Sequence, residues 1–268
     1  YVNVGYAWRS QYKNNPPYVP IENNHVGSYR KEIIIPAEWS EKEIFAHFGS
    51  VTSNMYLWVN GKYVGYSEDS KLEAEFNLTK YLKPGKNLIA FQVFRWCDGT
   101  YLEDQDFFRF SGIFRNVVLY AKPELHVEDL WAKPVLETDG KTGSFSMELT
   151  VSARDTAADK TGQLGSVSWR IVEKGTEDIK GTGTVLIEGG KEIHIQIPSQ
   201  IIPDVRPWSH EDPFLYLLEI RVKNVRGEIV EIVPYEIGFR RIAMDHGIMT
   251  LNGKRLILHG VNRHEWSA

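Results

Sequence analysis

The sequence predicts an all-β protein of about two domains. Its runs of β-branched and aromatic residues are short, and Gly, Pro, Asn or Asp separates each run from the next. Asn-Gly dipeptides divide alternating runs at positions 60–61 and 252–253, and this dipeptide is the strongest short signal for a β-hairpin. No window of eleven or more residues shows the apolar spacing of an amphipathic helix. The length of 268 residues fits two domains of roughly 150 residues each.

The first 122 residues contain five predicted strands. The first strand stops at Pro36, since proline cannot continue a hydrogen-bonded ladder. The second and third form a hairpin about Asn60-Gly61, because a type I′ turn needs a positive φ at both central residues. Pro84-Gly85 introduces the fourth, which is typical of a buried strand. In chain order the five strands cover residues 28–35, 55–59, 62–66, 87–95 and 116–120. Single helical turns are predicted at 40–43 and 79–82.

Residues 124–240 predict an immunoglobulin-like sandwich. About seven short strands over roughly 115 residues is the pattern of that fold. Because the chain has one cysteine, Cys97, the domain lacks the disulfide of antibody domains. The predicted strands cover 124–134, 144–153, 166–173, 183–187, 192–197, 215–223 and 229–237.

A third segment begins at Arg241. Residues 248–251 and 254–259 flank Asn252-Gly253 and predict another hairpin. The sequence GVNRHE follows at 260–265.

Composition and charge exclude several classes of protein. Lys and Arg number 31 against 35 Asp and Glu, a net charge of −4, whereas a nucleic-acid binder needs clustered cations. The longest apolar runs are about five residues, far short of a membrane-spanning helix. The single cysteine excludes an internal disulfide framework and a multi-cysteine zinc site, and it fits a reducing compartment. No GxSxG, GxGxxG or phosphate-binding loop is present.

The densest group of chemistry-bearing residues is the segment 95–115, RWCDGTYLEDQDFFRFSGIFR. Its carboxylates suit sugar hydroxyls and its aromatic rings suit the C–H faces of a sugar, while carboxylate oxygens also suit a hard cation. The alternative is a structural turn in which Arg109 and Arg115 pair with neighbouring carboxylates. The carboxylates and rings are Asp98, Glu103, Asp104 and Asp106, and Trp96, Tyr101, Phe107, Phe108, Phe110 and Phe114.

Two further groups carry less chemistry. Residues 262–265 (NRHE) follow an apolar strand, which is where barrel enzymes present catalytic groups. Adjacent strand residues face opposite sides, however, so His264 and Glu265 would not share one substrate atom, and a structural histidine is the alternative. Residues 207–216 (PWSHEDPFLY) predict a rigid, aromatic-anchored turn with a packing role.

Together these motifs resemble glycoside hydrolase family 2, and within it the large bacterial β-galactosidases. The matching segments occur in family order and cover nearly the whole chain, and 95–115 and GVNRHE are the most specific. The segments are 3–6 (NVGY), 15–20 (NPPYVP), 48–66 (FGSVTSNMYLWVNGKYVGY), 95–115, 207–216, 238–240 (GFR) and 251–265 (LNGKRLILHGVNRHE).

The resemblance implies three domains. Residues 1–122 would be a jelly-roll sugar-binding domain without its N-terminal portion, and 123–240 an immunoglobulin-like sandwich. Residues 241–268 would be the first strand region of a (β/α)₈ catalytic barrel. Such a barrel needs about 250 residues, so the chain is expected to be the N-terminal part of a larger enzyme and to be inactive alone.

The resemblance also implies site residues. Asp106, the second Asp of DQD, matches the family residue that contacts galactose hydroxyls and helps bind sodium. Asn3 and Val4 match a pair beside the substrate, and His264 matches a histidine that supports the transition state. The magnesium ligands and both catalytic glutamates of the family would lie outside these 268 residues. Sodium and magnesium are therefore expected for the whole enzyme, and neither for the chain alone.

The implied activity is retaining hydrolysis of terminal β-D-galactosides such as lactose. One alternative is another family 2 glycosidase, a β-glucuronidase or β-mannosidase, although DQD with FSGIFR weighs against it. Another is a stand-alone carbohydrate-binding module. The resemblance implies a homo-oligomer without nucleic-acid or membrane partners. We expect a cytoplasmic location, with the periplasm as the alternative.

Overall fold

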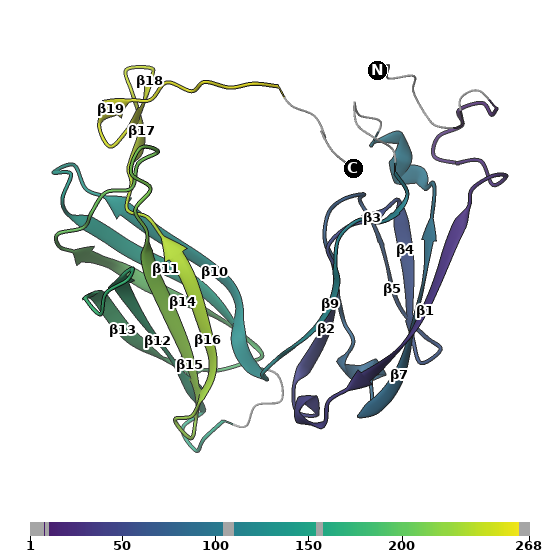
Figure 1. Ribbon diagram of the computed structural model, residues 1–268. Helices are drawn as coiled ribbons and strands as arrows, with labels where there is room; N and C mark the ends of the chain where they lie inside the picture. Colours follow the sequence, from purple (N-terminus) through teal and green to yellow (C-terminus); the bar gives the residue numbers. More distant parts are fainter. Residues whose placement is uncertain (1–7, 9–10, 104–109, 154–157, 263–268) are drawn as a thin grey trace. The chain divides into compact units, whose positions relative to one another are not determined.

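The computed structural model describes residues 8, 11–103, 110–153 and 158–262 of the chain. The chain divides into two compact units, and the boundary lies between Lys122 and Pro123 (Figure 1). Nearly all regular structure is β-strand, which confirms the predicted fold class. None of the helices in the described residues has the length and apolar character needed to cross a membrane.

One sheet of the first unit has four antiparallel strands in the order β1-β7-β4-β5. Asn60 and Gly61, with φ of +52° and +78°, connect β4 to β5, so the predicted hairpin is confirmed. The strands are β1 (Val26–Ile35), β7 (Gly85–Phe94), β4 (Asn54–Val59) and β5 (Lys62–Glu68).

The facing sheet has the order β6-β2-β9, and β3 and β8 form a separate short pair (Figure 1). An apolar core formed by side chains of both sheets, Phe48, Met55 and Leu57 among them, makes the unit a sandwich. The sequence reasoning missed β2, because its residues are nearly all buried and do not alternate in polarity. The strands are β6 (Ala74–Asn77), β2 (Glu43–Phe48), β9 (Val117–Lys122), β3 (Val51–Thr52) and β8 (Gly112–Ile113).

The helical turns in the described residues are 3₁₀ turns: η1 (Ala37–Trp39), η2 (Thr79–Tyr81) and η3 (Asp98–Tyr101). The turn predicted at 79–82 is confirmed. The turn predicted at 40–43 is wrong, because it forms earlier, where the Trp39 amide donates to the Pro36 carbonyl at 3.1 Å. Glu43 already begins β2.

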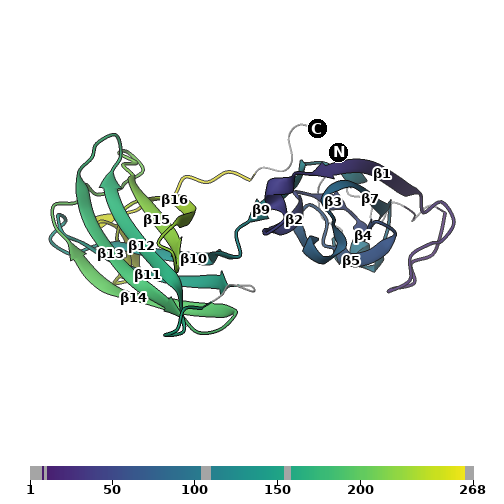
Figure 2. The ribbon, with the colours of Figure 1, turned by 90° about the horizontal axis from the view of Figure 1, so that it is seen from below.

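The second unit is a seven-stranded sandwich of the immunoglobulin-like type (Figure 2). Its sheets have the orders β10-β11-β14 and β13-β12-β15-β16. Inward residues alternate with outward ones, most regularly along β11, and Phe145 meets Trp169 across the core with ring centroids 5.2 Å apart. The strands are β10 (Leu125–Leu136), β11 (Gly143–Ala153), β12 (Gln163–Glu173), β13 (Ile179–Glu188), β14 (Glu192–Ile202), β15 (Tyr216–Asn224) and β16 (Ile229–Ile237).

A small sheet follows, formed by β17 (Ile242–Asp245), β18 (Ile248–Leu251) and β19 (Lys254–Arg255). Asn252 and Gly253 make the predicted hairpin turn, with φ of +52° and +77°. The strand predicted at 254–259 is shorter than expected. The division into three domains, with a barrel strand in 241–268, stays a prediction.

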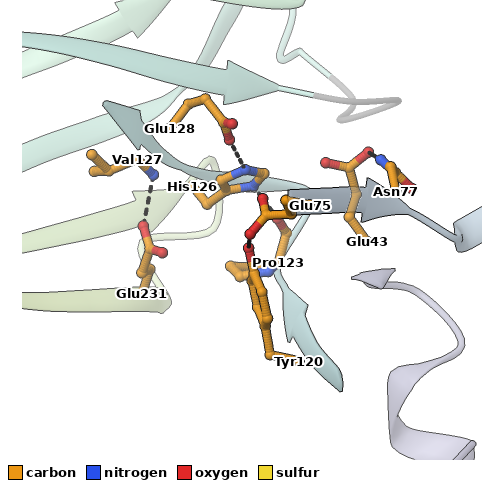
Figure 3. Close-up of polar contacts among 9 residues, drawn as sticks. All are labelled: Glu43, Glu75, Asn77, Tyr120, Pro123, His126, Val127, Glu128 and Glu231. Carbon is orange, nitrogen blue, oxygen red and sulfur yellow. Dashed lines mark hydrogen bonds and ion pairs between the residues drawn. The ribbon is translucent and has the colours of Figure 1, made fainter. Parts of the chain in front are cut away.

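Side chains fix the strand that enters the second unit (Figure 3). His126 is fully buried, and its two ring nitrogens lie 2.6 Å from the Pro123 carbonyl oxygen and 2.9 Å from a Glu128 carboxylate oxygen. The Val127 amide donates to Glu231 of β16 at 2.7 Å. These contacts bind the start of β10 to its own sandwich.

Within the first unit, two polar pairs link β2, β6 and β9 (Figure 3). The Tyr120 hydroxyl donates to Glu75 at 2.5 Å, and the Asn77 side chain donates to the buried Glu43 at 3.3 Å. The last strand of the first unit is therefore held by its own sheet.

Candidate functional site

The four site residues expected from the family resemblance, Asn3, Val4, Asp106 and His264, lie outside the described residues. The structure does describe the segments next to them in the chain. These are Trp8, residues 11–25 and residues 95–103. They form one aromatic and acidic cluster beyond the end of β7.

The turn at 95–103 is built by its own polar groups. The Cys97 amide donates to the Thr100 hydroxyl at 3.0 Å, and the Thr100 amide donates back to the Cys97 carbonyl at 3.1 Å. The Glu103 amide donates to the Gly99 carbonyl at 3.1 Å. The side chains of Cys97 and Thr100 also form a capping box, in which each accepts a hydrogen bond from the other residue's amide at the start of the turn. The turn therefore presents Asp98 and Glu103 from a defined backbone.

Three aromatic rings join this turn to the segment that precedes β1. Trp8 is fully buried and meets both Trp96 and Tyr101 edge-on, with ring centroids 5.2 Å apart in each pair. Edge-to-face aromatic pairs contribute about 0.5–1.5 kcal/mol beyond the burial of their area. Trp8 is four positions after Val4, and Tyr101 is five positions before Asp106. The structure thus brings together the described neighbours of two predicted substrate-binding stretches.

Carboxylates gather on one side of the turn. Among the described residues, ligand atoms of Glu68, Cys97 and Asp98 lie within 4.8 Å of one another, as in a site that could hold a metal ion. A Cβ built on Gly99 would lie 3.6 Å from Cys97 Sγ, 3.6 Å from Glu68 Oε2 and 3.8 Å from Glu103 Oε1. These are ordinary van der Waals distances, so Cys97, Glu68 and Glu103 all lie close to the Gly99 backbone.

Hydrogen bonds orient this acidic group. The Tyr66 hydroxyl donates to Glu68 at 2.7 Å and accepts from the Asn54 side chain at 3.1 Å. Glu103 accepts from the Ser70 amide at 2.8 Å. Burial raises the pKa of Tyr66, and its neighbour Glu68 raises it further, so this phenol stays a donor.

The thiol of Cys97 stays protonated at neutral pH. Burial is the main cause and raises its pKa from 9.0 to about 11, and the negative charges of Glu68 and Glu103 add to the shift. A protonated thiol is a poor ligand for a hard cation, which prefers oxygen. Glu68 and Asp98 are the oxygen donors of this group, and a magnesium ion held by two carboxylates completes its octahedral shell with water or substrate oxygens.

Three buried oxygen atoms near this turn have no hydrogen-bond partner in the part of the chain that the structure describes: Thr52 Oγ1, Asn54 Oδ1 and Ser70 Oγ. Thr52 is next to Ser53, whose hydroxyl donates to the Arg95 carbonyl at 2.7 Å. Buried polar groups are nearly always satisfied by protein or ordered water, so these three atoms are positions where water or a ligand would bind.

A cavity of about 290 Å³ opens beside the same strand ends. Its polar lining includes His25, Arg95 and Ser111, and the Arg95 guanidinium lies over the Trp96 ring at 4.8 Å from its centroid. A second cavity, of about 390 Å³, lies between the two sheets of the first unit. Its lining is mostly apolar and brings no catalytic groups together.

Sequence reasoning identified the 95–103 turn but missed Glu68, and it also missed Asn24, whose side chain exchanges two hydrogen bonds with the Trp96 backbone. In the sheet, Glu68 pairs with Asn54 and Asn54 pairs with Phe94. This register brings Glu68 next to the turn, and a strand order of β7-β4-β5 cannot be read from periodicity alone. The alternative in which Arg109 and Arg115 pair with neighbouring carboxylates stays open, since Arg109, Asp104 and Asp106 lie outside the described residues.

The chain thus combines a sandwich that presents an aromatic and acidic turn at its end with an immunoglobulin-like sandwich that follows it. The chain belongs to the glycosyl hydrolases family 2. The profile of the family's sugar binding domain matches residues 1–123, and a second profile of the family matches residues 125–240. The family resemblance inferred from the motifs is confirmed.

Several curated relatives that match the chain are named beta-galactosidases. One from Priestia megaterium is 37% identical over 100% of this chain, which covers 26% of that protein. One from Halalkalibacterium halodurans is 38% identical, with 100% and 25% covered. A beta-galactosidase large subunit from Lactobacillus acidophilus is 36% identical, with 100% and 43% covered. The chain thus spans about a quarter of the length of the first two.

Solved structures show the same fold at lower identity. A Bacteroides uniformis beta-glucuronidase has a TM-score of 0.76 and 23% identity, and the match covers 90% of this chain and 30% of that one. A glycosyl hydrolase family 2 member from Bacteroides cellulosilyticus has a TM-score of 0.73 and 22% identity, with 88% and 31% covered.

Proposed function

We propose that the protein carrying this chain is a retaining β-galactosidase, and that the chain supplies its substrate-orienting part. The observation that carries the proposal is identity of 36–38% over the whole chain with proteins named beta-galactosidases. The glucuronidase structures share 20–23% identity, which is a likeness of fold alone. The orphaned oxygens around the 95–103 turn support a ligand site there.

In the proposed reaction, a glutamate outside these 268 residues attacks the sugar and a second acts as acid and then as base. Asp106 accepts hydrogen bonds from galactose hydroxyls, and Asn3 and Val4 lie beside the sugar. Holding the sugar against the nucleophile lowers the entropic part of the barrier. His264 supports the developing charge of the transition state.

The proposed cations are sodium and magnesium. Asp106 would help hold sodium, which would supply a fixed positive charge near the sugar hydroxyls. Glu68 and Asp98 are oxygen donors suited to a hard cation, but they are too few to fill a magnesium shell alone. We further propose a homo-oligomer in the cytoplasm.

The test is to express the complete reading frame and to assay nitrophenyl β-galactoside, β-glucuronide and β-mannoside. Turnover of the galactoside with little of the other two supports the proposal, and preference for either other sugar contradicts it. The 268-residue chain alone should give no measurable turnover. A reading frame that ends at Ala268 in a protein that binds sugar would favour the carbohydrate-binding module.

Asp106→Asn in the complete protein isolates the proposed sugar contact. A hydrogen bond to a charged group contributes about 1.5–3 kcal/mol, so kcat/KM for the galactoside should fall roughly 10- to 150-fold. Asp159→Asn is the matched control, because Asp159 is exposed in a turn of the second unit and bonds only to its own loop. Unchanged kcat/KM in Asp106→Asn would remove the proposed role.

A further inference from the structure

We propose that Tyr101 and Asn24 are positioning residues for the sugar. They tie the segment 11–25 to the 95–103 turn, and in the sequence these two segments adjoin the stretches that carry Asn3 and Val4 and that carry Asp106. This inference rests on the proposed function, and it concerns residues to which neither the motifs nor the family resemblance assigns a role.

The Tyr101 hydroxyl links the 95–103 turn to the turn at Asn15–Tyr18, and few side chains could make this link. The Asn15 amide donates to it at 3.1 Å, and it donates to the Tyr18 carbonyl at 2.8 Å. The turn between them is closed by its own bond, from the Tyr18 amide to the Asn15 carbonyl at 2.8 Å. The turn leaves one donor and one acceptor facing outward. A hydroxyl satisfies both because it donates and accepts at a single atom.

Asn24 makes the second link. Its side-chain amide donates to the Trp96 carbonyl at 3.0 Å, and its side-chain oxygen accepts from the Trp96 amide at 2.9 Å. The Arg95 amide donates to the His25 carbonyl at 3.0 Å. An asparagine side chain thus continues the pairing of β1 with β7 beyond the last strand residues, Val26 and Phe94.

These links act on a segment that has little regular structure to hold it. The described residues between Trp8 and Val26 contain no strand, only an isolated bridge between Asn15 and Tyr18. Neither Tyr101 nor Asn24 belongs to the core cluster of the first unit. Removing a link should therefore free the segment without unfolding the sandwich.

A segment that is no longer held weakens sugar binding because fewer molecules are in the arrangement that binds the sugar. If the binding-competent arrangement is populated only in part, the apparent affinity falls by that fraction. Each lost hydrogen bond contributes about 0.5–1.5 kcal/mol, which corresponds to roughly a 2- to 13-fold effect. Once the sugar is bound, the arrangement is restored. The cost therefore falls on KM and leaves kcat nearly unchanged.

The test compares Tyr101→Phe and Asn24→Ala with Tyr63→Phe in the protein expressed from the complete reading frame. Tyr63 is 51% exposed on β5, away from the 95–103 turn in its strand pairing. With nitrophenyl β-galactoside, KM should rise about tenfold in the first two variants, with kcat within twofold and the melting temperature nearly unchanged. A merely structural role predicts the reverse, a lower melting temperature with unchanged KM, and would overturn the proposal.

A second measurement is independent of catalysis. In the 268-residue chain, amide hydrogen exchange at Asn15 and Trp96 should speed up in Tyr101→Phe and Asn24→Ala, respectively, and stay at the wild-type rate in Tyr63→Phe. Unchanged exchange overturns the inference even if the wild type hydrolyses galactosides. A wild type that turns over no galactoside removes the proposed function, while the exchange result still decides whether these residues hold the segment.

Discussion

The reactivity of the Cys97 thiol indicates whether the 95–103 turn is folded. Its pKa is raised to about 11, chiefly by burial, so the thiolate that reacts with disulfide reagents is scarce in the folded protein. Relative to an ordinary thiol of pKa 9.0, the thiolate fraction at pH 8 is about 100-fold lower. We expect Ellman's reagent to react far more slowly with the native chain than with the chain in guanidinium, because the thiol is buried and mostly protonated. Equal rates in the two states would contradict the structure of the turn.

At the scale of single residues, the sequence shows which side chains are suited to a binding site better than it shows which residues they contact. Asp98, Glu103 and Tyr101 stand out because acidic and aromatic residues are dense around them. Asn24 does not, since it is an ordinary asparagine before a strand, 72 residues from the backbone that it binds. Asn3, Val4, Asp106 and His264 stay predictions.

The β4–β5 hairpin depends on Asn60 for both its backbone and its contacts. Asn60 has a φ of +52°, its side-chain amide donates to Tyr81 and Asn87, and its side-chain oxygen accepts from the Leu88 amide. Asn60→Ala should cost about 2–4 kcal/mol, because it adds left-handed strain to the lost hydrogen bonds.

Asn60→Gly separates these two causes. Glycine adopts the positive φ without strain but makes none of the side-chain bonds, so its cost should be about half that of alanine. Urea denaturation of the three proteins measures the difference. Equal stability of the glycine and alanine variants would show that the backbone conformation contributes nothing.

The turn between β10 and β11 makes the stability of the second unit depend on pH in the acidic range. Asp139 accepts from the Thr142 hydroxyl and from the Lys141 and Thr142 amides, and these bonds lower its pKa from 3.8 to about 2. The lowered pKa means that the bonds stabilise the fold above pH 3.8 and are lost as the pH falls through 2. The wild type should therefore melt at a higher temperature than Asp139→Asn at pH 5, and the two should converge near pH 2. A gap that persists at pH 2 would contradict this account.

At the scale of elements, turn chemistry is the reliable signal. Asn60-Gly61 and Asn252-Gly253 predict both hairpins, because few other residues adopt two successive positive φ values. Strand β2 and the four-residue β6 escape prediction, since one is buried along nearly its whole length and the other is too short to show a period. Which strands are neighbours depends on long-range pairing, and no local pattern encodes it.

The whole molecule combines two cores that share no residue. Every residue of the second core lies between Leu125 and Phe239, and the first core lies between Ala46 and Val93. Folding is driven mainly by burial of apolar surface, so each core should sustain its own sandwich. The sequence anticipated this through the regular strand spacing after residue 123. It did not show that the hairpin after Arg240 packs with the second unit.

This hairpin yields the last prediction, that residues 123–260 fold alone and are more stable than residues 123–240. The Asn252 side chain donates to the Trp208 carbonyl at 3.0 Å and accepts from the Arg241 amide at 2.9 Å, and Leu251 is buried. The shorter fragment also lacks Arg241, so its sandwich loses one hydrogen bond and the packing of one buried leucine, which should cost about 2–4 kcal/mol. Both fragments should show β-sheet circular dichroism and a single cooperative urea transition, with the midpoint of the shorter one lower. Coincident midpoints would show that the hairpin is independent of the sandwich, and a longer fragment without a cooperative transition would show that the second unit does not fold alone.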